Sequence, residues 1–146
     1  MIKAIPINIL LIEDNEGDVL LTKQLFSKSQ IHNQLWIARD GEEGLDFLHQ
    51  RKKFFNVPRP DLILLDLNMP KMDGKEVLAA IKQDEELASI PVVILTTSSA
   101  KQDVLESYQL NANCYIVKPV DFIQFIKIIQ GIENFWFSIV KLPSQV

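Results

Sequence analysis

Short runs of apolar residues recur along the chain, and each run is bounded by turn residues or acids. Five of these runs, mostly Ile, Leu and Val, predict β-strands at residues 8–12, 35–38, 62–65, 92–96 and 115–117. Polar residues do not alternate with the apolar ones, which indicates strands that are covered on both faces. The pattern therefore favours a parallel sheet.

Amphipathic stretches lie between these runs and predict helices at residues 17–29, 101–110 and 121–140. Asp40 and Asp73 each precede a glutamate by three residues, which is a capping-box pattern. We therefore expect two further helices, each beginning directly after its capping aspartate.

Strand and helix alternate to give five strand-helix units along the chain. Right-handed crossovers between parallel strands force helices onto both faces of the sheet. We expect an α/β fold, with a doubly wound five-stranded parallel sheet flanked by five helices. Residues 1–146 should form one domain, with an insertion near residues 49–61 and a C-terminal helix extended to about residue 140.

Composition narrows the class of protein. The chain has 146 residues, of which 47% are hydrophobic and 23% charged, as in a globular domain. No stretch reaches the roughly 18 apolar residues of a membrane span, and the first residues lack a signal-peptide pattern, so we expect a cytoplasmic protein. The net charge of −4 and the single short basic cluster at residues 51–53 argue against direct binding of nucleic acid.

Three carboxylates follow predicted strands: Glu13 and Asp14 after the first, and Asp66 after the third. They should converge, because the carboxyl ends of parallel strands share one edge of a sheet. Like charges about 4 Å apart repel by about 4 kcal/mol at an effective dielectric constant of about 20, so the cluster needs a cation or raised pKa values. Ligands that are all oxygen favour Mg²⁺. Glu13 and Asp14 can equally serve a helix cap, whereas a loop follows Asp66 and leaves it no helix to cap.

Two further strand ends add polar groups at the same edge. Lys118 follows the last strand and can pair with a carboxylate or with a phosphoryl oxygen. Thr96 begins a hydroxyl cluster at residues 96–99, a pattern that also occurs in ordinary loops. Separate segments of the chain thus place acids, a lysine and hydroxyl groups at one edge of the sheet. This combination indicates a functional site.

In order and spacing, the segments IEDN, LLDLNMPKMDG, IPVVILTTSS and YIVKP resemble the receiver domains of bacterial two-component signalling, which have a flavodoxin-like fold. The resemblance covers about residues 7–127. It implies that Asp66 is the phosphoacceptor and that Mg²⁺ is the cofactor. The implied metal ligands are Asp14, Asp66, the backbone carbonyl of Asn68 and, often through water, Glu13. It further implies that Lys118 bridges to the phosphoryl group.

The same resemblance implies a switch. Thr96 matches the hydroxyl that follows the phosphoryl group, Thr97 a backbone N–H that contacts it, and Tyr115 the aromatic switch residue. The one departure from the commonest pattern is Glu13, where many receivers have aspartate.

The implied function is a single-domain response regulator that takes a phosphoryl group from a sensor histidine kinase and catalyses only its own phosphorylation and dephosphorylation. The segments at residues 49–61 and 133–143 resemble stand-alone regulators paired with cyanobacterial phytochromes, which makes a bacterial phytochrome the candidate kinase. One alternative is an aspartyl-phosphate hydrolase, but such enzymes usually carry an aspartate where this chain has Asn68. The other is a phosphate-independent pseudo-receiver that acts as a binding module.

The predicted final helix is apolar on more than one face. Phe122, Ile126 and Trp136 can face the sheet, which leaves Phe135 and Ile139 outside that stripe. Soluble monomers rarely leave such a patch in water, so we expect a homodimer through this helix and the adjoining face near Tyr115. In the alternative, the tail covers the insertion within one chain.

Overall fold

A computed structural model describes residues 6–28, 32–118 and 127. The elements follow the order β1 (Ile7–Ile12), α1 (Glu16–Ser27), β2 (Asn33–Ala38), α2 (Gly41–Leu48), the 3-10 helix η1 (Lys52–Phe54), β3 (Leu62–Leu65), α3 (Gly74–Gln83), β4 (Val92–Thr96), α4 (Lys101–Gln109) and β5 (Cys114–Val117). The five predicted strands and the first four predicted helices are confirmed, with ends shifted by one or two residues. The fifth predicted helix lies outside the described residues except for Lys127, which is helical.

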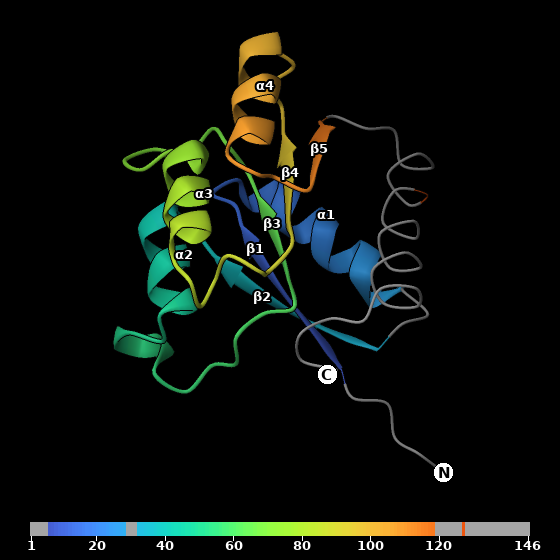
Figure 1. The fold of residues 1–146 in the computed structure, drawn as a ribbon. Coiled ribbons are helices and arrows are strands. Elements are labelled where there is room, and N and C mark those ends of the chain that lie inside the picture. The colour runs from blue at the N-terminus through green and yellow to red at the C-terminus, as the bar shows by residue number, and fades with distance from the viewer. Residues whose placement is uncertain (1–5, 29–31, 119–126, 128–146) are drawn as a thin grey trace.

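The five strands form one sheet in the order β2-β1-β3-β4-β5, and all neighbouring pairs are parallel (Figure 1). This confirms the predicted parallel sheet. At the carboxyl edge, Ile12 of β1 lies opposite both Ala38 of β2 and Leu65 of β3. The residues that follow Ile12 and Leu65 therefore emerge at the same level of the sheet.

Helices cover both faces of the sheet, with α2 and α3 on one side and α1 on the other (Figure 1). Ile63 and Leu65 of β3 join the core beneath α2 and α3, whereas Leu62 and Leu64 join the core beneath α1. All four of these side chains are buried, which explains why the strands lack polar alternation. Within the described residues, no helix has the length and apolar character needed to cross a membrane.

Side-chain caps set the starts of three helices. Asp40 accepts a hydrogen bond from the backbone N–H of Glu43 (2.7 Å), and Asp73 accepts one from that of Glu76 (3.0 Å), as the capping-box pattern predicts. At α1 the cap is Asn15, which accepts from the backbone N–H of Asp18. Asn15 therefore caps α1, and the carboxylates of Glu13 and Asp14 do not.

Gly74 begins α3 in close contact with the backbone that follows β3. Its N–H donates to the carbonyl oxygen of Leu67 (2.9 Å). A methyl group on Gly74 would lie 2.3 Å from the carbonyl oxygen of Asp66 and 2.6 Å from Cα of Leu67. The absence of a side chain here therefore lets α3 start directly against the loop that carries Asp66.

We predict that Gly74→Ala lowers the free energy of unfolding by about 1–3 kcal/mol, because the backbone around Asp66 has to move to admit the methyl group. Urea denaturation measures the change. Gly17→Ala in α1 is the matched control, since its methyl group meets only Asn15 Oδ1, at 3.3 Å. Equal effects of the two substitutions would contradict this account.

Candidate functional site

Three carboxylates meet at the carboxyl edge of the sheet. Glu13 and Asp14 follow β1, and Asp66 follows β3. Each offers an oxygen atom, and these three atoms lie within 4.8 Å of one another. Glu13 and Asp66 are buried, whereas Asp14 is exposed to solvent. The structure therefore brings together the three acids that the sequence places at strand ends.

The buried pair of carboxylates is electrostatically costly. Burial and the neighbouring Asp66 raise the pKa of Glu13 to about 7, although Lys118 acts in the opposite direction. Asp66 is held beside β1 because its N–H donates to the carbonyl oxygen of Ile12 (3.1 Å). Its Oδ1 accepts from the backbone N–H of Asn68 (3.2 Å). The site thus fixes two acids side by side where water screens them poorly.

Lys118 follows β5 and extends its ammonium group into this cluster. Its Nζ lies 2.5 Å from Glu13 Oε1 and 2.7 Å from Asp18 Oδ2. Burial lowers the pKa of Lys118, but hydrogen bonds to Asp18 and Glu13, together with the charges of Glu13 and Asp66, raise it overall. The expected pairing of Lys118 with a carboxylate of the cluster is confirmed, with Glu13 as the partner among the three strand-end acids.

Asp18 is a residue that sequence reasoning missed. It stands in the first turn of α1, where an acid is expected merely to favour the helix N-terminus. The available signal was its place in that turn, because α1 begins shortly after the carboxyl end of β1 and its first turn therefore lies near the same edge of the sheet.

Asn68, Thr96 and Thr97 form the other side of the site. The amide Nδ2 of Asn68 donates to the hydroxyl oxygens of both threonines, at 3.3 Å each. Thr96 ends β4 and is fully buried. The two threonines and Asn68 therefore lie together; a strand end predicts this place for Thr96, and the family resemblance implies it for Asn68 and Thr97.

Tyr115 is linked to this group through Ser98. The Tyr115 hydroxyl donates to the carbonyl oxygen of Ser98 (2.9 Å), and the backbone N–H of Ser98 donates to Oγ1 of Thr96 (3.4 Å). Burial raises the pKa of the Tyr115 hydroxyl, so it stays a protonated donor at neutral pH. A short chain of hydrogen bonds thus joins Thr96 to Tyr115.

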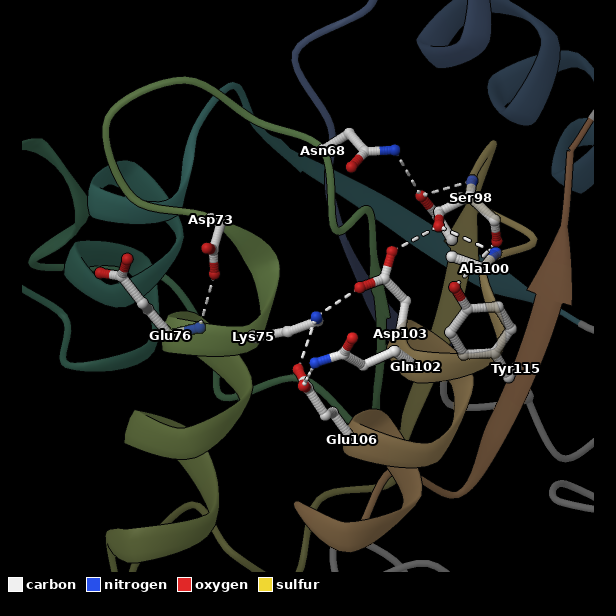
Figure 2. A network of polar contacts seen from close by, with 11 residues as sticks. Asn68, Asp73, Lys75, Glu76, Ser98, Ala100, Gln102, Asp103, Glu106 and Tyr115 are labelled. Carbon is white, nitrogen blue, oxygen red and sulfur yellow. Dashed lines mark hydrogen bonds and ion pairs between the residues drawn. The ribbon is translucent and has the colours of Figure 1, made fainter.

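The same loop is tied to two helices that sequence reasoning did not connect. Figure 2 shows Lys75 of α3 reaching across to Asp103 and Glu106 of α4. The hydroxyl of Ser98 donates to Oδ2 of Asp103 (2.5 Å). Hydrogen bonds to Asp103 and Glu106 raise the pKa of Lys75, which stays charged. The start of α4 is therefore held by α3 on one side and by the loop after β4 on the other.

The family model that matches this chain is the response regulator receiver domain, over residues 9–130. Response regulator Rcp1 of Synechocystis is 49% identical over 139 residues, which are 95% of this chain and 95% of Rcp1. The probable methanogenesis regulatory protein FilR2 of Methanothrix harundinacea is 36% identical over 95% of this chain and 89% of its own length.

Solved structures agree with these sequence matches. The Mn²⁺-bound form of response regulator Rcp1 has a TM-score of 0.86 at 49% identity and covers 94% of this chain and 99% of its own. The phosphorylated cyanobacterial phytochrome response regulator RcpA has a TM-score of 0.88 at 45% identity and covers 95% and 99%. With its flavodoxin-like sheet and its acids at the carboxyl edge, the chain belongs to the response regulator receiver domain family.

Proposed function

We propose that this response regulator accepts a phosphoryl group on Asp66 from a sensor histidine kinase and signals through a change of its surface. The observation that carries the proposal is the convergence of Asp66 with Glu13 and Asp14 at one sheet edge. We assign Asp66 as the nucleophile because it matches the phosphoacceptor position of the receiver domains that this chain resembles, and because its carboxylate belongs to the cluster. The chemistry needs a carboxylate held in place with compensating positive charge beside it.

In the proposed reaction, a carboxylate oxygen of Asp66 forms a bond to phosphorus. The bond between phosphorus and the imidazole nitrogen of the donor breaks, and the imidazole keeps the electron pair. Attack requires screening of the negative charge on both reactants, since a carboxylate and a phosphoryl group repel. Lys118 supplies one positive charge, and the Thr96 hydroxyl is available to the transferred oxygens.

The donor set fits a hard divalent cation. Carboxylate oxygens of Glu13, Asp14 and Asp66 lie within 4.8 Å of one another, and the exposure of Asp14 leaves room for bound water. We assign Mg²⁺ to Asp14, Asp66 and the backbone carbonyl of Asn68, with Glu13 reaching it through water. Bound there, the cation would screen the charge of Asp66 and of the incoming phosphoryl oxygens. The similar protein Rcp1 has been solved in a Mn²⁺-bound form.

Thr96 and Tyr115 are proposed to carry the switch. A phosphoryl group on Asp66 offers strong acceptors to the hydroxyl of Thr96. That hydroxyl now accepts from the N–H of Ser98, whose carbonyl in turn holds the Tyr115 hydroxyl. A shift of Thr96 would therefore release Tyr115 and alter the face formed by α4 and β5.

We do not expect this chain to hydrolyse outside substrates. Asn68 occupies the place where aspartyl-phosphate hydrolases usually carry an acid, and its amide is hydrogen-bonded to Thr96 and Thr97. An amide cannot act as a general acid. A phosphate-independent binding module would not need the buried acids and the lysine that converge here.

A bacterial phytochrome is the proposed kinase, because the similar protein RcpA is a cyanobacterial phytochrome response regulator. We also propose that the chain acts in the cytoplasm, where ATP is available to such a kinase. The output is proposed to be a contact with a further protein rather than with nucleic acid, since the net charge is −4.

We predict that Asp66→Asn abolishes phosphoryl uptake from a cognate kinase or acetyl phosphate, because an amide lacks the nucleophilic oxygen. Uptake is measured with radiolabelled donor and magnesium. Asp61→Asn is the control, since Asp61 is also buried but lies at the opposite end of β3, where it binds the N–H of Asn8. Wild-type labelling of the Asp66→Asn protein would contradict the assignment.

We predict that Mg²⁺ affinity rises about tenfold between pH 6 and pH 8, because the pKa of Glu13 is raised to about 7 and its proton opposes the cation. Below about pH 7 the carboxyl is mostly neutral, and it becomes charged as the pH rises. Asp14→Ala should weaken binding at every pH, and Glu13→Gln should flatten the pH dependence. Calorimetric titration at pH 6, 7 and 8 tests this, and an affinity independent of both pH and Asp14 would refute it.

The homodimer remains a proposal, because the final helix lies outside the described residues. It is supported by apolar side chains exposed on α4 and β5, where Leu105 is 52% and Tyr108 47% exposed. We predict a dimer in sedimentation equilibrium at micromolar concentration, tightened by beryllofluoride and disrupted by Phe135→Asp with Ile139→Asp. Phe55→Asp, at an exposed position after η1, should leave it intact. A monomer in both conditions would favour the tail covering the insertion instead.

A further inference from the structure

Lys118 is held by two carboxylates that come from different elements. Glu13 follows β1 and its side chain is 2% exposed, whereas Asp18 lies in α1 with its side chain 34% exposed. Among the described residues, the ion pairs of Lys118 within 4.0 Å are with these two acids and not with Asp66. The resting ammonium group is therefore bound on the β1–α1 side of the phosphoacceptor.

Asp18 is placed for this contact by its helix. Its backbone N–H donates to Oδ1 of Asn15 (3.0 Å), and its carbonyl oxygen accepts from the hydroxyl of Thr22 (2.8 Å). These bonds fix the backbone of Asp18 in the first turn of α1. Its carboxylate takes no part in capping and reaches Lys118 instead. Removing the carboxylate would therefore leave the cap of α1 in place.

We base the following inference on the proposed function. Asp18 would disfavour a phosphoryl group on Asp66 in two ways. The first is competition, because the ammonium group that serves the phosphoryl oxygens is already paired with Asp18. The second is repulsion, because a phosphoryl group brings about −1.5 to −2 charges near a fixed carboxylate. A cation bound by the cluster would offset the charge of Glu13. Asp18 is not one of the three acids of the cluster, so its charge would stay.

We propose that Asp18 is a positioning residue that holds Lys118 toward α1 in the resting state and thereby weakens the phosphorylated state. Its contact sets how readily the lysine passes to the phosphoryl group. Loss of the Asp18 carboxylate releases Lys118 and stabilises the phosphorylated form. Asp18 thus tunes the bias of the switch without touching the reacting atoms.

The test measures the affinity of beryllofluoride, a phosphoryl mimic, at saturating magnesium by calorimetry. We expect Asp18→Asn to bind it roughly threefold to fivefold more tightly, the size expected for loss of one partly exposed ion pair. Asp18→Glu keeps the charge and should restore affinity to near the wild-type value. The aspartyl phosphate formed from acetyl phosphate should decay more slowly in Asp18→Asn than in wild type.

Glu16→Gln is the matched control. It removes one charge from the same helical turn, but Glu16 pairs with Arg39 rather than with Lys118. We expect its beryllofluoride affinity to stay within about twofold of wild type, as for an exposed charge. Equal tightening by Glu16→Gln and Asp18→Asn would reduce the effect to net charge and overturn the proposal. Unchanged or weaker binding by Asp18→Asn would overturn it too, whereas failure of wild type to bind beryllofluoride would refute the proposed function instead.

Discussion

Glu13 and Asp66 are buried side by side because β1 and β3 are neighbours in a parallel sheet and end at the same level. Two unit charges 4.8 Å apart repel by about 3–4 kcal/mol at an effective dielectric constant of about 20. Burial, together with the neighbouring Asp66, raises the pKa of Glu13, and the ammonium group of Lys118 offsets part of the negative charge. Lys118, Asp14 and Asp18 place further charge around this pair, whereas Asn68, Thr96 and Thr97 contribute neutral hydrogen-bonding groups.

The loop after β4 links the site to α4 and to Tyr115 through hydrogen bonds. The backbone N–H of Ser98 donates to Oγ1 of Thr96. The hydroxyl of Ser98 donates to Asp103 of α4, and its carbonyl oxygen accepts from the Tyr115 hydroxyl (Figure 2). Lys75 joins the same Asp103 to α3. A change at the Thr96 hydroxyl therefore acts on a loop whose contacts decide the positions of both α4 and Tyr115, and no long-range deformation of the sheet is needed.

The parts of this site that depend on strand ends were predictable from the sequence. In a parallel sheet, a residue that follows a strand must lie at the carboxyl edge, so Glu13, Asp66 and Lys118 could be brought together from pattern alone. The capping aspartates Asp40 and Asp73 were equally readable, because a cap depends on local spacing.

Contacts that helices make with distant segments were not predictable in the same way. The pairing of Asp18 with Lys118 joins residues 100 positions apart, and it depends on how α1 packs beside β5. The bridge from Lys75 to Asp103 depends likewise on the packing of α3 against α4. An exposed acid in a first turn has the same sequence pattern whether or not a distant lysine lies opposite, so only the folded arrangement distinguishes the two cases.

The balance of charge explains why a lysine shared between two acids suits a reversible switch. At rest one ammonium group faces Glu13 and Asp18, with Asp14 and Asp66 close by, so negative charge exceeds positive. A divalent cation would offset much of that excess, and phosphorylation of Asp66 would then exchange one carboxylate charge for about −1.5 to −2 charges. In the phosphorylated site negative charge would again exceed positive charge. The ammonium group of Lys118 could move toward the phosphoryl oxygens and offset part of that excess. Under the role proposed for Asp18, its ion pair with that lysine would compete with the phosphoryl group, and the phosphorylated state would be weak enough to be reversed.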